Sequence, residues 1–305
     1  MKKPALLFLL FLLSCFRVTA QTEPKELWKV VNDKKQADTL RLEALRRICM
    51  EGYLYRRPDS AAFYADRLYK MAGQLHSTKY QALALNVHGA SSSLRGDNKR
   101  AIAYFTRSLK IMEKLQDQKG ISSCLNNIGV IYDEMGQTKK AEGYYQRALT
   151  INKLRKDSSS IALSYSNLGN IYRYQRDYDK SIRYHQQAIR IYETLHDDYS
   201  LGMSLHFIAV TYFDLGDYTQ ALSYNEKSIP YYEKSGNLPG LPEVLTIQGK
   251  IYAKLGDSQK AIDFNKRALA LAQEVGVASG TREASLFLYK QYKKLGKLED
   301  ALAMH

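Results

Sequence analysis

Histidine is the side chain that most often transfers protons or binds metals near neutral pH. The chain has six histidines, and no two of them have the spacing with which one helix presents a pair of zinc ligands. Walker, GxGxxG, EF-hand and GxSxG signatures do not occur in the sequence. Carboxylates are spread throughout, so no pair stands out as a general acid and base. We therefore expect no catalytic residue, no bound metal and no cofactor.

The secondary-structure elements that would position any site follow a sequence repeat of forty residues. Residues 166–193 read SNLGNIYRYQRDYDKSIRYHQQAIRIYE, and stretches with the same skeleton lie forty residues before and after them. Apolar residues at offsets of three and four form two stripes separated by a break, which predicts a pair of amphipathic helices. The repeats are expected to start near residues 41, 81, 121, 161, 201, 241 and 281, with the last one incomplete.

Small and aromatic residues recur at fixed positions of this repeat. A glycine within the first helix, such as Gly129 or Gly169, costs about 1 kcal/mol relative to alanine, so its recurrence predicts a close approach of the partner helix. Alanines of the second helix, such as Ala141, are expected to form the other half of that approach. Ten of the 24 tyrosines lie in two of the repeated columns, which favours core packing over stacking on bases or sugars.

The break between the helices carries its own signals. A glycine such as Gly216 suits the left-handed residue that ends a helix, and the aspartate that follows it can cap the next helix. Among the histidines, His88 falls in an apolar column and is expected to be partly buried. His185 and His196 fall in second-helix or loop positions and are expected to be solvated.

This combination of columns resembles the tetratricopeptide repeat (TPR) over residues 41–305. The pattern departs from that family in its period, which is forty rather than about 34 residues, and in lacking the terminal proline. The resemblance implies an all-α fold: a right-handed superhelical solenoid of antiparallel helix pairs with about six and a half repeats. Residues 21–40 are expected to form an N-terminal capping region.

The resemblance also implies a concave groove lined by the first helices. Asparagine can hold a peptide backbone through its donor and its acceptor, and Arg173 and Lys250 could meet a carboxylate. The Lys/Asn set of chaperone-binding TPR domains is not reproduced, so a clamp for a C-terminal carboxylate is not expected. An ordinary solvated groove is the alternative for every one of these positions. The candidate groove residues are Asn86, Asn126, Asp133, Asn170, Arg173, His206, Phe213 and Lys250.

The first twenty residues have the pattern of an export signal. Lys2 and Lys3 precede an apolar run, and small residues lead up to Ala20, after which we expect cleavage. In the alternative interpretation, LLSC is a lipoprotein box and Cys15 is lipidated. Either route predicts an exported protein of the periplasm or cell envelope.

Charge and cysteine content argue against a nucleic-acid-binding protein and against a disulfide-stabilised fold. The formal net charge of +14 suggests an anionic partner, but Lys and Arg spread over exposed helix faces explain it as solubility, and export argues against nucleic acid. Once Cys15 is removed with the signal, Cys49 and Cys124 are too few for a disulfide framework and are expected to be buried thiols.

The expected function is a non-catalytic, exported scaffold that binds a peptide or protein segment in its groove. The array resembles the extracytoplasmic input region of bacterial membrane-bound signalling proteins, such as sensor histidine kinases, in its leading signal, its forty-residue period and the stretch PDSAAFYA. In such proteins a membrane helix and an output domain follow, so membrane association would come from Cys15 or from a segment beyond His305. The alternatives are a self-associating envelope protein, joined through its C-terminal end as a homo-oligomer, and an enzyme whose site has no recognised motif.

Overall fold

The computed structural model describes residues 24–55, 57–236 and 238–304. The regular structure of these residues is helical throughout, and no strand occurs among them. None of the described helices combines the length and the apolar character that crossing a membrane requires. The expected signal peptide and Cys15 lie outside the described residues.

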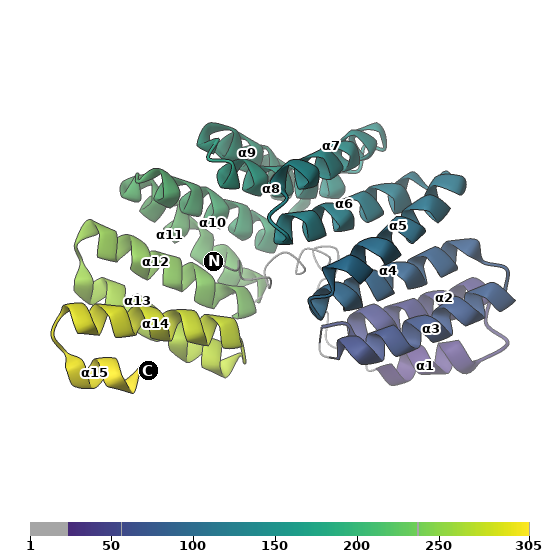
Figure 1. The fold of residues 1–305 in the computed structure, drawn as a ribbon, viewed down its shortest axis with the longest axis horizontal. Helices are drawn as coiled ribbons and strands as arrows, with labels where there is room; N and C mark the ends of the chain where they lie inside the picture. The colour runs from purple at the N-terminus through teal and green to yellow at the C-terminus, as the bar shows by residue number, and fades with distance from the viewer. Residues whose placement is uncertain (1–23, 56, 237, 305) are drawn as a thin grey trace. The chain divides into compact units, whose positions relative to one another are not determined.

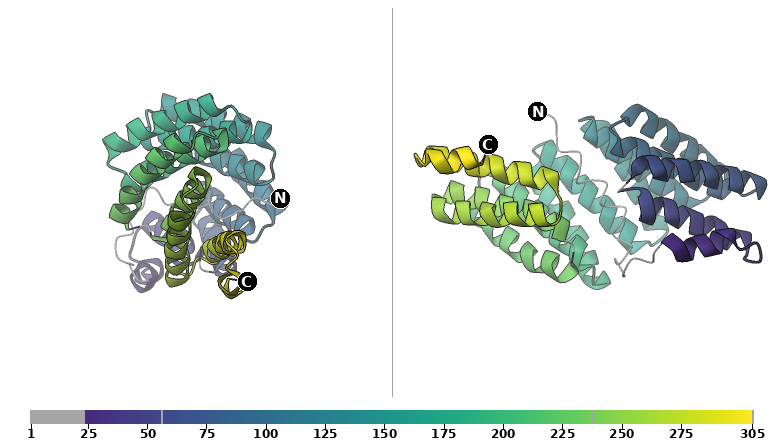
Figure 2. Two further views of the ribbon diagram at one scale, coloured as in Figure 1. Left: turned by 90° about the vertical axis from the view of Figure 1, so that its left-hand side faces the viewer. Right: turned by 90° about the horizontal axis from the view of Figure 1, so that it is seen from below.

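The chain divides into two compact units, Met1–Ser164 (unit 1) and Tyr165–His305 (unit 2). The division falls inside helix α8 (Ser158–Tyr174). Each unit is a stack of antiparallel helix pairs, and Figure 2 shows the packing of neighbouring helices within each unit from two further directions. The all-α, TPR-like solenoid expected from the sequence is confirmed.

Unit 1 begins with one helix, α1, inside the expected capping region, and continues as helix pairs (Figure 1). The first helices of its pairs begin three residues before the repeat starts expected from the sequence. The elements are α1 (Pro24–Asn32), α2 (Asp38–Arg47) with a π-helical extension η2 (Ile48–Tyr53), α3 (Pro58–Gln74), α4 (Thr78–Leu94), α5 (Asn98–Lys114), α6 (Gln118–Glu134), α7 (Thr138–Leu154) and the start of α8.

Unit 2 repeats the arrangement with the remainder of α8 and the helices that follow it. Its last described helix, α15, is short, and the side chains of Leu298 and Leu302 on it are 64% and 73% exposed. The elements are α9 (Tyr178–Leu195), α10 (Asp198–Leu215), α11 (Tyr218–Ser235), a 3-10 turn η3 (Leu238–Gly240), α12 (Leu241–Leu255), α13 (Ser258–Glu274), α14 (Ala278–Lys294) and α15 (Leu298–Ala303).

The breaks between helices form as the sequence predicts. Gly216 ends α10 with a φ of 92°, in the left-handed region where a Cβ would be strained. The carboxylate of Asp217 then accepts a hydrogen bond from the backbone N–H of Gln220 and caps α11. The caps predicted at Asp97 and Asp257 form in the same way.

The repeated glycines make room for a side chain that the sequence pattern did not reveal. A Cβ placed on Gly129 would lie 2.7 Å from Cε1 of Tyr145, and one on Gly169 would lie 2.6 Å from Nε2 of His185. The nearest atoms therefore belong to a large residue of the second helix rather than to its alanine. His185 is fully buried, so its expected solvation is wrong. The residues at this position of successive repeats are Phe105, Tyr145, His185, Asn225 and Asn265.

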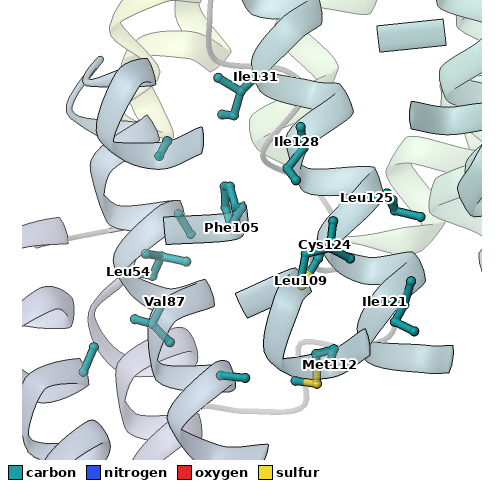
Figure 3. Close-up of a cluster of buried hydrophobic side chains, with 14 of the residues drawn as sticks. Leu54, Val87, Phe105, Leu109, Met112, Ile121, Cys124, Leu125, Ile128 and Ile131 are labelled. Carbon is teal, nitrogen blue, oxygen red and sulfur yellow. The ribbon is translucent and has the colours of Figure 1, made fainter. Parts of the chain in front are cut away.

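Interlocking side chains from consecutive pairs form the core of unit 1 (Figure 3). Cys49 and Cys124 are buried free thiols, as expected, and burial raises the pKa of Cys49 to about 12. His88 is partly buried, as predicted, and it lies 3.1 Å from an Asp66 carboxylate oxygen and stacks on a tyrosine ring. The cluster in Figure 3 includes Leu54, Val87, Phe105, Leu109, Met112, Ile121, Cys124, Leu125, Ile128 and Ile131.

Candidate functional site

Unit 1 contains a groove of about 500 Å³ on the side formed by its first helices. Two candidate residues from the sequence, Asn86 of α4 and Asn126 of α6, line it together. Apolar side chains form part of the wall: Met50, Tyr55, Leu83, Met112 and Leu163. Amides and hydroxyls supply most of the remainder: Asn127, Asn152, Ser122, Ser123, Ser159, Ser160 and Ser164.

Charged residues at the groove are mostly neutralised by one another. A guanidinium nitrogen of Arg46 lies 2.6 Å from the Glu43 carboxylate, and Nζ of Lys79 lies 2.8 Å from the Asp117 carboxylate. The ion pair with Lys79 and the backbone N–H of Gly120 hold the pKa of Asp117 below its usual range, against the effect of burial. A ligand would therefore meet a wall of nearly balanced charge.

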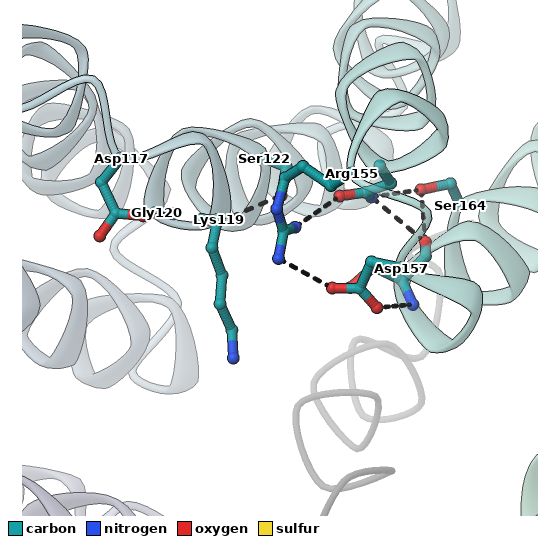
Figure 4. Close-up of polar contacts among 9 residues, drawn as sticks. Asp117, Lys119, Gly120, Ser122, Arg155, Asp157 and Ser164 are labelled. Carbon is teal, nitrogen blue, oxygen red and sulfur yellow. Dashed lines mark hydrogen bonds and ion pairs between the residues drawn. The ribbon is translucent and has the colours of Figure 1, made fainter.

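The polar residues at the α7–α8 end are fixed by a small hydrogen-bond network (Figure 4). The Asn152 amide donates to the Ser160 carbonyl and to Oγ of Ser164, each at 3.3 Å. Arg155, beyond the end of α7, pairs with Asp157 at 3.0 Å. In Figure 4 the Lys119 side chain extends away from these contacts. The network orders this end of the groove before any ligand arrives.

Asn86 keeps part of its hydrogen-bonding capacity unused. Its Oδ1 accepts a hydrogen bond from Sγ of Cys124 at 3.4 Å, and its amide nitrogen donates to no other described residue. A thiol is a weak donor, so the carbonyl oxygen of this amide also remains a good acceptor. Because an amide donates and accepts at once, Asn86 can bind a backbone C=O and N–H of an extended peptide.

The third candidate of unit 1, Asp133, does not line this groove. Its side chain is buried near the end of α6, beside Glu134. Burial and the Asp133 carboxylate together raise the pKa of Glu134 to about 7.

Unit 2 holds the other five candidates, and most of their charge is already paired. Arg173 lies 2.6 Å from the Asp214 carboxylate, and Lys250 pairs with Glu283. Phe213 is half-buried and packs on the Tyr218 ring at a centroid distance of 5.5 Å.

Asn170 of α8 is buried, with 1% of its surface exposed, and neither polar atom of its amide has a hydrogen-bond partner among the described residues. A buried amide without partners costs about 1–3 kcal/mol. Asn170 is therefore a position where a ligand or a water molecule would be stabilised.

His206, the last candidate, is held in one tautomer by a buried polar chain. Its Nδ1 lies 2.9 Å from Oδ1 of Asn225, whose amide nitrogen donates to the Val244 carbonyl at 3.0 Å and to Gln248 at 2.6 Å. Because Asn225 presents its oxygen, Nδ1 carries the proton and Nε2 has the free lone pair. Burial lowers the pKa of His206 to about 4, so the ring is neutral at pH 7.

Sequence reasoning missed Asn225 and Gln248. The available signal was a pair of amides at positions that are aromatic or aliphatic in several other repeats: Asn225 stands where Tyr145 stands in α7, and Gln248 where Ile128 stands in α6. Polar residues in apolar columns of a repeat predict a buried hydrogen-bond network.

The histidines and carboxylates with the most displaced pKa values lie outside the unit 1 groove. Burial and Glu283 raise the pKa of Glu243 to about 7, and burial lowers the pKa of His185 to about 3. Neither of these residues, nor Glu134 or His206, lines the groove. Within the described ranges, no three His, Cys, Asp or Glu side chains are placed to hold a metal ion.

The helix pairs and the groove of unit 1 define an all-α helical-repeat protein. The sequence profile described as "Tetratricopeptide repeat" matches residues 80–153, 160–234 and 200–274. These matches cover more than half of the chain, which therefore belongs to the tetratricopeptide repeat family. No curated protein matches the sequence significantly.

Solved structures share the fold at low sequence identity. The apo form of RapI superposes with a TM-score of 0.68 at 16% identity, covering 86% of this chain and 94% of RapI. Aspartyl phosphate phosphatase F from Bacillus subtilis gives 0.66 at 19% identity, covering 92% and 84%. NprR in complex with its cognate peptide NprX gives 0.64 at 15% identity, covering 92% and 80%. At these identities the similarity concerns the fold alone.

Proposed function

We propose that the protein is a non-catalytic scaffold that binds an extended peptide or protein segment in the groove of unit 1. The observation that carries this proposal is the composition of the groove wall. Amides and hydroxyls alternate with apolar side chains, while nearby charges pair with one another. Such a wall suits a backbone with small or apolar side chains better than a highly charged ligand. The peptide complex of the structurally similar NprR supports the same use of the fold.

A peptide selection followed by groove substitutions tests the proposal. A displayed library of random peptides is selected against the full chain, and enriched sequences are measured by fluorescence anisotropy. The variant Asn86→Ala/Asn126→Ala should weaken binding by about tenfold or more, because each amide loses hydrogen bonds to the backbone.

Gln146→Ala is the matched control, because Gln146 is exposed on α7 and its side chain hydrogen-bonds only to Glu142 among the described residues. Unchanged melting temperatures separate loss of binding from loss of folding. The proposal fails if no peptide is enriched, or if enriched peptides bind the double variant as well as the parent.

We further propose that this scaffold is exported and forms the sensing or interaction part of a signalling system in the periplasm or cell envelope. The support is the sequence of residues 1–20 and the resemblance to the input regions of membrane-bound signalling proteins. Mass spectrometry of the protein from envelope fractions distinguishes the routes. Cleavage predicts Gln21 as the first residue, whereas lipidation predicts a diacylglyceryl mass on Cys15 that Cys15→Ser abolishes. A full-length cytosolic product contradicts both.

Self-association is a second candidate role, favoured by the exposed leucines of α15. If this surface joins two copies, Leu298→Ser/Leu302→Ser shifts a dimer to a monomer in light scattering. A parent protein that stays monomeric at all concentrations removes this candidate.

A further inference from the structure

Basic residues are unevenly distributed over the second helices of the repeats. Helices α5 and α7 of unit 1 together carry nine Lys and Arg and only two Glu. Helices α9, α11 and α13 of unit 2 carry eight Lys and Arg but also six Asp and Glu. The repeat positions are equivalent, so solubility alone would not place the excess on two neighbouring second helices. The cations are therefore concentrated on the exposed faces of two neighbouring second helices.

Most of these cations take no part in holding the fold together. Three cations make local contacts: Arg100 with Asp97, and Lys140 and Arg147 with the rings of Tyr132 and Tyr144. Five others are exposed, and no carboxylate of the described residues lies within 4.0 Å of them. They are Lys99, Arg107, Lys110, Lys114 and Lys139.

Apolar side chains border the same surface. Leu154, the last residue of α7, is 81% exposed, and Leu115, which follows α5, is 43% exposed. The two helices are the second helices of successive antiparallel pairs (Figure 1), so their C-terminal ends, where both leucines stand in the sequence, point the same way. Lys114 and Lys153 stand beside them in the sequence. This combination of exposed cations and flanking leucines is typical of surfaces that enter the headgroup region of a bilayer.

We propose that the outer surface of α5 and α7 docks on a membrane that contains anionic phospholipid. Its cations would contact lipid phosphates, while Leu154 and Leu115 would enter the headgroup region. Nucleic acid fits less well, because Tyr104 and Tyr144 each already use one ring face for stacking, on His88 and Tyr132, which limits what they offer to a base. The groove is lined mainly by the first helices, so a docked molecule keeps its groove accessible.

Vesicle co-sedimentation of the full chain tests the proposal. Vesicles contain phosphatidylcholine with or without about 30 mol% phosphatidylglycerol. The parent protein should bind only the anionic vesicles, and about 0.5 M salt should release most of it. Neutralising three cations in Lys99→Gln/Lys110→Gln/Lys114→Gln should reduce partitioning about 100-fold, since each cation near the surface contributes roughly fivefold.

The control removes the same charge from unit 2, in Arg183→Gln/Arg190→Gln/Lys266→Gln, and should change partitioning less than about threefold. Leu154→Ser should weaken binding to anionic vesicles by a few fold without altering its salt dependence. If both triple variants lose the same amount of vesicle partitioning, binding depends on net charge alone and not on the surface of α5 and α7, and the proposal is overturned. A parent protein that does not bind anionic vesicles would also overturn the proposal. Salt-sensitive binding to single-stranded RNA in that case would assign the basic surface to nucleic acid instead.

Discussion

The glycine at the centre of each first helix gives the sharpest test of the packing. Gly129→Ala adds one methyl group whose carbon would lie 2.7 Å from Cε1 and 2.9 Å from Cδ1 of Tyr145. The Tyr145 side chain is fully buried and cannot swing into solvent. Overpacking of this kind costs about 1–3 kcal/mol, while the alanine recovers about 1 kcal/mol of helix propensity. We expect a net loss of about 1 kcal/mol in the free energy of unfolding.

Gly143→Ala is the matched control on the partner helix of the same pair. Gly143 lies within α7, is exposed, and a Cβ there meets nothing within 4 Å. Because no clash opposes it, only the higher helix propensity of alanine over glycine acts here, so this variant should be more stable than the parent by up to about 1 kcal/mol. Urea denaturation followed by circular dichroism at constant temperature measures both variants.

A double-mutant cycle then assigns the clash to one ring. Tyr145→Ala alone should cost about 3–5 kcal/mol because it leaves a cavity. Adding Gly129→Ala to that variant should no longer be destabilising, because the new methyl group faces space instead of the ring. Additive losses, or equal effects at Gly129 and Gly143, would refute this packing of Gly129 against Tyr145.

Three further outcomes follow from buried polar and ionisable groups. Asn225→Ala should lower the free energy of unfolding by about 1–3 kcal/mol in urea titrations, because it leaves buried Nδ1 of His206 without an acceptor; a neutral effect would contradict the polar chain. Glu243 has a folded-state pKa of about 7, raised from 4.5, so its ionisation makes stability fall as pH rises from 4.5 to 7. Glu243→Gln should remove that loss and be more stable than the parent at pH 8, by on the order of 1–3 kcal/mol, whereas exposed Glu233→Gln should not change the pH profile. Cys49, whose thiol pKa is about 12, should react with iodoacetamide only after unfolding, as mass mapping would show.

The sequence was sufficient for the helix pairs because their signals are local. Offsets of three and four, a glycine at the break and an aspartate after it act within a few residues, so Gly216 and Asp217 could be placed without knowledge of the fold. The burial of His185 could not be found in this way. The burial depends on the space left by Gly169, which lies sixteen residues earlier in the chain. In addition, the residue at the position of His185 changes from aromatic to imidazole to amide between repeats, so the sequence does not show that these residues share one role.

The candidate site was predicted only in part, for a related reason. The repeat register identifies which helix face lines a groove, and it brought Asn86 and Asn126 to the same wall. It does not show which charges are already paired. Arg173 meets Asp214, forty-one positions away in the next first helix, and that contact depends on side-chain directions that the columns do not contain.

Site-specific cross-linking tests the central claim, that the groove of unit 1 holds a peptide, most directly. A photoreactive residue replaces Ser123, which lines the groove, or Gln146, which is exposed on α7, and each protein is irradiated with a peptide selected for binding. The proposed function predicts a peptide adduct from position 123 and none from position 146. Adducts from position 146 alone, or equal adducts from both, would contradict it.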